Sequence, residues 1–529
     1  MASNQSKLTF DYVVVGTGPA GAVIAKTLSD DKKTSVLIID AGENNDRDKP
    51  IRDSRFAPVL EEEFSPQYFW QGEGVPQEGV DDRTFEWTTG RLSGGGSSIN
   101  GEQYVRPTSF VLRKWEKLLG SLWSPEQAIQ SFKQLEDYHG KTKNPEIHGF
   151  NGRLNIRQAP AKPPSVTKKL VSAIEDVTGF PKILDYNDPR TPIGPFFRWQ
   201  LYQKPNGERE SASTAFLSSD IMTPDGIGVN GRKLRVYYKS TALRILFEGK
   251  KAVGIEFLKE GQKVQAFARK QVIISAGINS AQLLMLSGIG PSNQLKQAGI
   301  PIVFENPNVG QFLTNHTLNT ATFSMNQKDL PEIQNDPFAL YTGGAFLPSP
   351  LSRNKRSRGV QLIGIVAEGQ LNIAILFLKP KSHGSIKIQN NDPLKIVLAD
   401  EGFLENEDDL NAIKAIYRTY IKNIAENLSK IDSTYQLINP TPETINDDEQ
   451  LENFIKENFG HNHHQQSSLR MAPINMGGVV DRLGRVHGVN NLIVADAQTI
   501  PFTVDGNTSA SAFLIGYTIA KEILKGNLD

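Results

Sequence analysis

Short apolar runs that end at glycine mark the front of the chain. Residues 12–15 form a β-branched run that stops at Gly16, and residues 22–28 then carry apolar side chains at helical spacing. A second β-branched run, residues 35–39, is followed at once by Asp40. The pattern predicts a strand, a glycine turn, a helix and a second strand, which is typical of a parallel α/β unit.

Similar patterns return later in the chain. Residues 272–276 predict a buried strand, followed by a turn at Gly277 and a short apolar helix. Residues 492–495 predict another buried strand, and residues 508–524 predict an apolar-striped helix with Asn507 as its N-cap. These segments therefore extend the same α/β layer.

The middle of the chain has a different pattern. Residues 372–378 and 385–388 read as alternating strands, and residues 407–424 as a long helix with an acidic start. A further helix is expected to begin at Asn446 as its cap and to stop at Gly460. Glycine-rich phosphate loops are absent from this part, which predicts a second domain.

Composition narrows the possible partners and chemistry. Lys plus Arg equals Asp plus Glu at 58 each, so no excess positive charge attracts nucleic acid or an anionic membrane. The chain contains no cysteine, which excludes disulfides, thiolate metal sites and a cysteine nucleophile. The early apolar run is too short for a signal peptide and no 18-residue apolar stretch occurs, so a cytoplasmic, soluble protein is expected.

The first glycine turn has the spacing of a dinucleotide site. Gly16 allows a tight turn, Gly18 lets the backbone approach a pyrophosphate, and Gly21 lets helix and strand pack closely. Free N–H groups at the helix start suit phosphate, and Asp40 is placed to accept hydrogen bonds from ribose hydroxyls. The motif indicates an adenine dinucleotide without separating FAD from NAD.

A second glycine-rich loop covers residues 91–101. Its small side chains allow a ligand to approach the backbone, and Ser97, Ser98 and Asn100 add short polar groups. The alternative interpretation is a flexible surface loop.

Three of the eight histidines, His461, His463 and His464, fall within four positions. They follow the helix expected to stop at Gly460, and loops on rigid scaffolds are where reactive groups gather. A metal site is disfavoured, because carboxylates are absent nearby and the spacing is not i, i+4. A solvated polar loop is the other alternative.

Five segments together resemble the glucose-methanol-choline (GMC) family of FAD oxidoreductases. Residues 91–106 and 275–291 look like the two family signatures, and residues 308–316 resemble its Gly-Val-Gly-x-Asn-Leu-x-Asp-His segment. Residues 378–385 resemble a strand turn of its substrate domain, and residues 464–524 its catalytic end. The segments span nearly the whole chain in the order of the family.

The resemblance implies an α/β fold with two domains. A Rossmann-like FAD-binding domain would be discontinuous, built from residues 1–155, 225–310 and 465–529. A second, α+β substrate domain on an antiparallel sheet would comprise residues 156–224 and 311–464.

The resemblance also implies non-covalent FAD. Some members attach the flavin through a histidine of the first signature loop, and Ile99 stands at that place here. The residues that would contact the cofactor are Gly16, Gly18, Gly21, Asp40, Ala41, Arg91, Gly95, Ser97, Asn100, Gly101, Ala242, Asp496, Ala497, Asn507 and Thr508.

Two catalytic positions follow from the resemblance. The family pattern His-x-x-Gly-Thr-x-x-Met assigns the base to His464, seven residues before Met471. Ser467 and Ser468 replace the usual Gly and Thr, so His463 stays an alternative. Asn507 occupies the second catalytic position, where the family carries His or Asn.

The implied activity is oxidation of an alcohol to a carbonyl by hydride transfer to flavin N5, with His464 as base. The partners would be a small-molecule alcohol and either oxygen or another electron acceptor, with no metal. A hydroxynitrile lyase and a fatty-acid photodecarboxylase are the alternatives on this scaffold, and His464 argues against the second. The alcohol cannot be read from the sequence. Candidates for a pocket wall, with packing as the alternative, are Tyr68, Phe69, Trp70, Phe196, Phe197 and Trp199.

Overall fold

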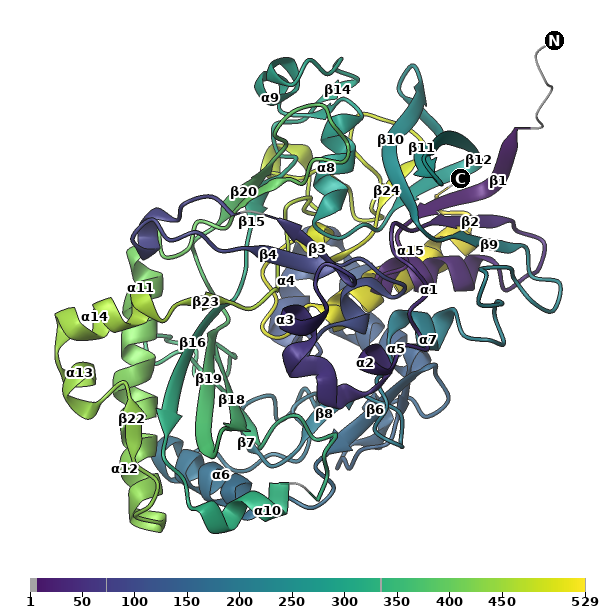
Figure 1. Cartoon of the computed structure of the whole chain (residues 1–529). Helices are drawn as coiled ribbons and strands as arrows, with labels where there is room; N and C mark the ends of the chain where they lie inside the picture. The colour runs from purple at the N-terminus through teal and green to yellow at the C-terminus, as the bar shows by residue number, and fades with distance from the viewer. Residues whose placement is uncertain (1–6, 73, 334, 529) are drawn as a thin grey trace.

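The computed structural model describes residues 7–72, 74–333 and 335–528. Two large sheets dominate it (Figure 1). The first has seven strands: β1 runs parallel to β2 and β12, β2 parallel to β9, and β12 parallel to β24, while β10, β11 and the start of β12 form an antiparallel meander. The strands are β1 (Leu8–Val15), β2 (Val36–Ile39), β9 (Leu234–Tyr237), β10 (Ser240–Glu248), β11 (Lys251–Lys259), β12 (Gln262–Ile274) and β24 (Leu492–Val494).

Helices cover the first sheet and share its core. The central strand β1 ends in four consecutive buried valine and tyrosine positions, as expected where a parallel strand is covered on both faces. Two long apolar helices, α1 and α15, pack directly against each other (Figure 1). The helices of this part are α1 (Pro19–Leu28), α4 (Ser109–Leu119), α5 (Pro125–Leu135), α7 (Ala212–Phe216), α8 (Asn279–Leu286), α9 (Ser292–Gln297) and α15 (Ser509–Leu524).

The second sheet is antiparallel and lies at the other end of the molecule (Figure 1). Its order is β22-β16-β19-β18-β17-β7, and β23 pairs with β16. The strands are β7 (Gly194–Phe196), β16 (Thr317–Phe323), β17 (Gly344–Leu347), β18 (Val360–Ala367), β19 (Gln370–Phe377), β22 (Leu437–Asn439) and β23 (Gly460–His461). The predicted α/β class with an antiparallel second sheet is confirmed.

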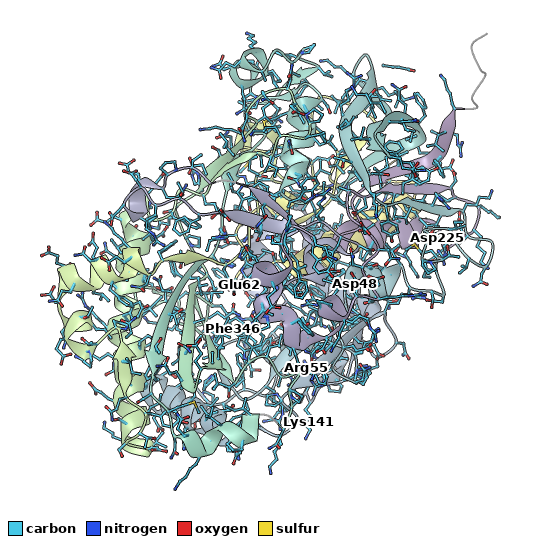
Figure 2. The ribbon with its side chains drawn as sticks, viewed as in Figure 1. Asp48, Arg55, Glu62, Lys141, Asp225 and Phe346 are labelled. Atoms are coloured by element: carbon cyan, nitrogen blue, oxygen red, sulfur yellow. The ribbon has the colours of Figure 1, made fainter. Side chains whose placement is uncertain are left out.

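Alternation along these strands gives the second sheet two different faces. On β18, Val360 and Leu362 point into a core shared with helices, whereas Ile363 and Ile365 point to the opposite side. Figure 2 shows Phe346 of β17 inside the molecule and charged residues such as Lys141 and Asp225 at its outside. The helices of this part are α6 (Ser165–Thr178), α11 (Glu407–Ile416), α12 (Lys422–Ile431), α13 (Pro442–Asn446) and α14 (Asp448–Glu457), with a π-helical turn between α11 and α12.

Smaller elements connect the two layers. Two of them, β3 and α3, come from a segment that borders the site described below. The connecting elements are α2 (Lys49–Arg52), α3 (Leu60–Phe64), β3 (Phe69–Gly72), β4 (Trp87–Gly90), β5 (Glu136–Tyr138), β6 (Leu154–Ala159), β8 (Trp199–Tyr202), β13 (Ile289–Gly290), β14 (Phe304–Glu305), β15 (Gln311–Leu313), α10 (Leu330–Ile333), β20 (Gly384–Lys387) and β21 (Leu398–Asp400).

The helix before the histidine loop differs from its expected limits. Asp447, not Asn446, is the N-cap of α14, and its side chain accepts a hydrogen bond from Gln450 N at 2.9 Å. Asn446 instead ends the short helix α13, and Gly460 belongs to β23 rather than to a helix stop. The prediction of one helix from Asn446 to Gly460 was therefore wrong at both ends.

Among all the helices that the structure describes, none combines the length and apolar character needed to cross a bilayer.

A buried charge network connects β5 with the segments around Arg106, His148 and Asp185. His148 Nδ1 lies 2.8 Å from Glu136 Oε1, and its Nε2 lies 2.8 Å from Asp185 Oδ2, while Arg106 also donates to Glu136. Carboxylates only accept here, so both ring nitrogens donate and His148 is an imidazolium stacked on Tyr138 at 3.6 Å. Burial alone lowers the pKa of His148, but the hydrogen bonds to Asp185 and Glu136 outweigh burial and raise it.

This raised pKa predicts a pH-dependent stability. The folded protein holds the His148 proton more tightly than the unfolded chain, so the stabilisation is complete below about pH 6.5 and is lost as pH rises through the raised pKa. In that window we expect this group to lower the free energy of unfolding by up to about 1.4 kcal/mol per pH unit. Urea unfolding of wild type and His148→Gln at several pH values from 6 to 9 measures the effect. An identical pH dependence in the two proteins would contradict it.

Candidate active site

A cavity of about 580 Å³ opens at the carboxyl ends of the parallel strands and extends to the second sheet. In open α/β sheets, ligands bind at this edge. The residues that follow four parallel strands all line it: Gly16 and Thr17 after β1, Asp40 and Ala41 after β2, Ser275 to Gly277 after β12, and Asp496 and Ala497 after β24.

The cavity collects nearly all of the site residues expected from the sequence. One exception, Gly21, lies behind the turn and does not line it. The lining residues among them are Gly16, Gly18, Asp40, Ala41, Arg91, Gly95, Ser97, Asn100, Gly101, Ala242, His464, Asp496, Ala497, Asn507 and Thr508.

The first glycine turn is packed on one side and open on the other. A Cβ at Gly16, where φ is 98°, would lie 2.4 Å from Ser275 O, and one at Gly21 would lie 2.1 Å from Gly16 O. Gly18 has an extended backbone, with φ −62° and ψ −176°, and no atom within 4 Å of its Cβ position. Gly16 and Gly21 therefore serve the fold, whereas Gly18 leaves room on the cavity side.

Two buried aspartates hold the turns in place. Asp40 Oδ2 accepts hydrogen bonds from Thr17 N at 2.8 Å and Thr17 Oγ1 at 2.6 Å, and its Oδ1 accepts from Gly42 N at 2.8 Å. Asp496 Oδ2 accepts from Ser280 Oγ at 2.6 Å. Burial raises the pKa of both groups, that of Asp496 to about 6. Each aspartate ties one turn to a neighbouring segment.

His464 is buried at the far end of the cavity, between the two sheets. Its Nδ1 lies 2.9 Å from His316 Nδ1, and its Nε2 lies 3.1 Å from Asn507 Nδ2. Its backbone N–H donates to Asn315 Oδ1 at 2.9 Å. Burial is the main cause that lowers the pKa of His464 well below its usual value, and the neighbouring His316 and His463 add to the effect.

The hydrogen bonds of His316 determine which nitrogen of His464 carries the proton. His316 Nε2 lies 2.9 Å from Val504 O, which only accepts, so this nitrogen is protonated. Burial lowers the pKa of His316 to about 4, so the ring is neutral and its Nδ1 is an acceptor. His464 Nδ1–H therefore donates to it, and the lone pair of neutral His464 lies on Nε2. The side-chain amide of Asn462 lies 3.0 Å from the same Nδ1. Because Nδ1–H is a donor, we assign the amide orientation in which the Asn462 oxygen, rather than its nitrogen, faces Nδ1.

Asn507 faces this lone pair and does not cap the last helix. The N-cap of α15 is Thr508, without a side-chain cap bond, so the prediction of Asn507 as N-cap was wrong. Gln361 Nε2 donates to Asn507 Oδ1 at 3.3 Å and to Gln103 Oε1 at 2.8 Å. The donation to its oxygen turns the Asn507 amide nitrogen toward His464 Nε2.

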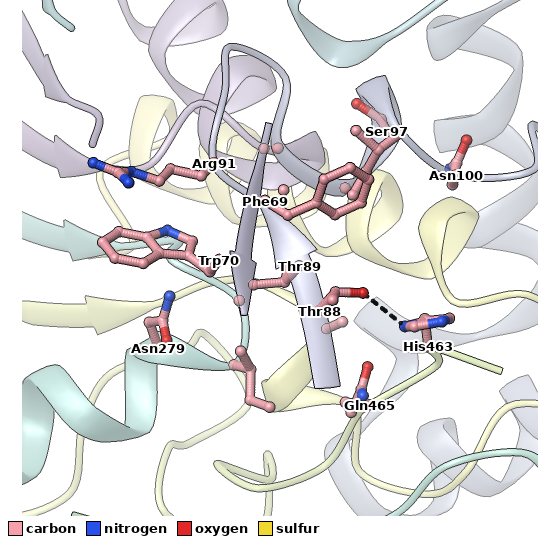
Figure 3. A pocket seen from close by; sticks show the side chains of 18 of the residues that line it. Phe69, Trp70, Thr88, Thr89, Arg91, Ser97, Asn100, Asn279, His463 and Gln465 are labelled. Atoms are coloured by element: carbon pink, nitrogen blue, oxygen red, sulfur yellow. Dashed lines mark hydrogen bonds between the residues drawn. The ribbon is translucent and has the colours of Figure 1, made fainter. Parts of the chain in front are cut away.

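His463 points to a different partner. Its Nδ1 lies 3.2 Å from Thr88 Oγ1 (Figure 3), and its Nε2 lies 3.7 Å from Glu61 Oε2 near the surface. His463 adopts a left-handed backbone with φ 51°, and His464 follows it into the interior. The structure thus brings His464, and not His463, to Asn507. Among the described residues, no group of three or more His, Asp or Glu side chains could hold a metal ion.

Several lining residues were not expected from the sequence. Phe69 and Trp70 do line the cavity (Figure 3), whereas Phe196 and Trp199 pack in a core. The unexpected residues on the second sheet look like ordinary strand-core positions, and only their alternation with the helix-facing set would have marked a separate face. They are Leu318, Ile363, Ile365, Ala374 and Leu376, with Tyr341 beside them.

Comparisons with known proteins point to the same family along most of the chain. Two family models, both described as GMC oxidoreductase, match residues 10–318 and 380–516. Mitochondrial choline dehydrogenase of Homo sapiens is 27% identical, with 99% of this chain and 91% of that protein aligned. An alcohol dehydrogenase (acceptor) of Pseudomonas putida is 28% identical, with 98% and 96% aligned. The crystal structure of pyridoxine 4-oxidase from Mesorbium loti has a similar fold, with a TM-score of 0.85 at 24% identity over 98% and 99% of the two chains.

The cavity also fits the dinucleotide that this family binds. Gly18, Gly96 and Gly277 line it, and no atom lies within 4 Å of a Cβ built at any of the three. The first turn of α1, directly after Gly18, presents backbone N–H groups without helical partners, which suits phosphate. The chain belongs to the GMC oxidoreductase family, and FAD is its expected cofactor.

Proposed function

We propose that this protein oxidises an alcohol to a carbonyl compound, with FAD as cofactor and His464 as the base. The observation that carries the proposal is the unprotonated Nε2 of a buried, neutral His464, 3.1 Å from the Asn507 amide nitrogen and at the wall of the cavity. The relatives named choline dehydrogenase and alcohol dehydrogenase support the same class of reaction.

His464 and Asn507 would act on the hydroxyl group in different ways. Asn507 Nδ2 lies at hydrogen-bond distance from His464 Nε2, and the alcohol would replace this contact: its O–H donates to His464 Nε2, and its oxygen accepts from Asn507 Nδ2. His464 then removes the hydroxyl proton while Asn507 holds the oxygen in position. Bound FAD supplies the acceptor, N5, for the hydrogen that leaves the carbon as a hydride. His316 keeps the His464 proton on Nδ1, so that Nε2 stays available as a base.

The remaining predicted residues would hold the cofactor. The turn at Gly16 and Gly18 and the start of α1 suit the pyrophosphate, and Asp40 with Ala41 lies where the adenosine ribose is expected. Ala242 would meet the adenine. The loop with Arg91, Gly95, Ser97, Asn100 and Gly101, and the segments Asp496–Ala497 and Asn507–Thr508, would contact the flavin half. Non-covalent binding is proposed, because Ile99 offers no nucleophile.

Anaerobic mixing of the purified, FAD-loaded protein with a panel of alcohols tests the function. An alcohol substrate should bleach the visible flavin absorption and yield the aldehyde or ketone in equal amount. Cleavage of a cyanohydrin without bleaching would instead indicate a lyase, and loss of carboxylate only under light a decarboxylase. Exposing the reduced protein to oxygen then tells an oxidase from a dehydrogenase.

The lowered pKa of His464 predicts the pH dependence of flavin reduction. His464 acts only when neutral, and its pKa lies well below the ordinary 6.5. We therefore expect the limiting rate to stay level from pH 8 down through 6.5 and to fall only at a clearly lower pH. Anaerobic stopped-flow measurements from pH 5 to 9 give this profile. A half-maximal rate at pH 6.5 or above would argue against a buried neutral base.

A further inference from the structure

One end of the cavity is built by the second sheet and carries no part of the glycine motifs. Leu318 of β16, Ile363 and Ile365 of β18, and Ala374 and Leu376 of β19 line it. Ile363 pairs with Ala374, and the pairing of Asn319 with Ile375 places Leu318 beside Leu376. These five side chains therefore form one continuous apolar surface, here called the floor, on a single face of the sheet.

Among the described residues, each carboxylate that borders the cavity is hydrogen-bonded or ion-paired within the protein, or is exposed to solvent. They are Asp40, Glu61, Glu102 and Asp496. Asp40 and Asp496 accept hydrogen bonds from the turns that they hold in place. Glu102 is buried: its Oε1 forms an ion pair with Arg209 at 3.2 Å without a hydrogen bond, and its Oε2 accepts from Gln203 at 2.7 Å and Ser54 at 2.9 Å. The Glu61 side chain is about half exposed, near the surface. A cationic substrate therefore finds no free buried carboxylate at the floor.

Several polar atoms near the floor are paired within the protein. Tyr341 Oη donates to Gly101 O at 2.7 Å. Asn100 Oδ1 accepts from Glu102 N at 3.0 Å, and Gln103 Oε1 accepts from Gln361. Gln361 Oε1, Gln465 Nε2 and Ser509 Oγ are buried without a hydrogen-bond partner, but the five side chains of the floor carry no polar atom. Each additional hydroxyl of a polyol that lay on the floor would therefore lose its water and gain no partner there. His464 and Asn507 are the pair that the geometry leaves for a single hydroxyl group.

We infer that the substrate is an uncharged alcohol with one hydroxyl group and a hydrocarbon body, which lies on the floor while its hydroxyl meets His464 and Asn507. This inference rests on the proposed function and names its substrate class. The name of the human relative refers to choline, a quaternary ammonium alcohol. The floor offers that cation only aliphatic side chains, so choline should be a poor substrate of this protein.

A substrate panel tests the class directly. The FAD-loaded protein is mixed anaerobically with 1-hexanol, benzyl alcohol, choline or glucose, and the rate of flavin bleaching is followed against concentration. Either hydrocarbon alcohol should reduce the flavin with a second-order rate constant at least roughly 10²-fold above those of choline and glucose. A higher constant for choline or glucose would overturn the substrate class and leave the proposed function standing. If every alcohol in a broad panel fails to bleach the flavin, the proposed function itself fails.

Two variants of the floor test the inference through ligand binding, without turnover. Ile365 is only partly buried, so Ile365→Asn should fold, and Ile365→Val is the matched control. The tertiary alcohol 2-methyl-2-hexanol has no hydrogen on its carbinol carbon and cannot be oxidised, so its binding is measured from the shift of the flavin spectrum. We expect its dissociation constant to rise roughly tenfold or more in Ile365→Asn and much less in Ile365→Val. Equal affinities for the two variants would show that the hydrocarbon body does not contact the floor.

Discussion

Replacing His464 with alanine should lower the limiting rate of flavin reduction by roughly 10²-fold or more. The expected loss follows from the geometry: His464 Nε2 carries the lone pair beside Asn507, and no other side chain of the described residues is placed to accept the hydroxyl proton there. FAD should stay bound, because the alanine variant keeps the glycine turn and both aspartates. Anaerobic stopped-flow reduction with the best alcohol of the panel gives the rate, and the absorption spectrum gives the flavin content.

The neighbouring histidine is the matched control. His463 is hydrogen-bonded to Thr88 (Figure 3) and lies 3.7 Å from Glu61, whereas Asn507 bonds His464. His463→Ala should therefore lower the rate far less than His464→Ala. The reverse order would reassign the base to His463, and a near wild-type rate in both variants would remove a histidine base from the mechanism.

The parallel strands β1, β2 and β24 and the end of β12 were predictable because their signals are local, whereas β9, β10 and β11 were not predicted. The β-branched strand, the turn at Gly16 and the helix that follows lie within twenty residues, and each element agrees with the next. The end of β12, residues 272–274, and β24 were equally clear, since parallel strands buried on both faces read as continuous apolar runs. Most candidate residues consequently line one cavity, because the carboxyl ends of these strands meet at one edge.

The errors arose where a polar side chain had two possible partners. Asn507 directly precedes the apolar-striped run 508–524, and local statistics favour a cap there. In the fold its amide instead meets His464 and Gln361, which are 43 and 146 residues away in sequence. Likewise Asp447 outcompeted Asn446 as a cap, a choice between adjacent residues that apolar periodicity does not resolve.

The substrate end was hidden for a related reason. Leu318, Ile363 and Leu376 are aliphatic residues in strands, and nothing local separates a wall of a cavity from a packed core. The role of His316 was equally hidden, since its effect on His464 depends on a contact between residues 148 positions apart. Both features become visible only when the second sheet is placed against the loop after β23.

The other large effect is expected at Gly18. Its backbone, with φ −62° and ψ −176°, is open to any residue, and no atom lies within 4 Å of its Cβ position. The fold alone therefore does not require glycine here. A side chain at this position would enter the cavity where the pyrophosphate is expected, beside Gly95, whose own Cβ position lies 3.2 Å from Gly18 Cα. Overpacking of this kind costs about 1–3 kcal/mol, or roughly 5- to 150-fold in affinity.

We therefore expect Gly18→Val to bind FAD roughly 100-fold more weakly than wild type and Gly18→Ala to lie between the two. The thermal midpoint of the cofactor-free protein should be nearly unchanged in both variants, because the new atoms point into open space. Gly21→Ala is the contrasting variant: its Cβ would lie 2.1 Å from Gly16 O, so it should lower the midpoint of the cofactor-free protein itself. Fluorescence titration with FAD and thermal unfolding without it separate the two effects. A Gly18→Val protein that binds FAD as tightly as wild type would place the pyrophosphate elsewhere in the cavity.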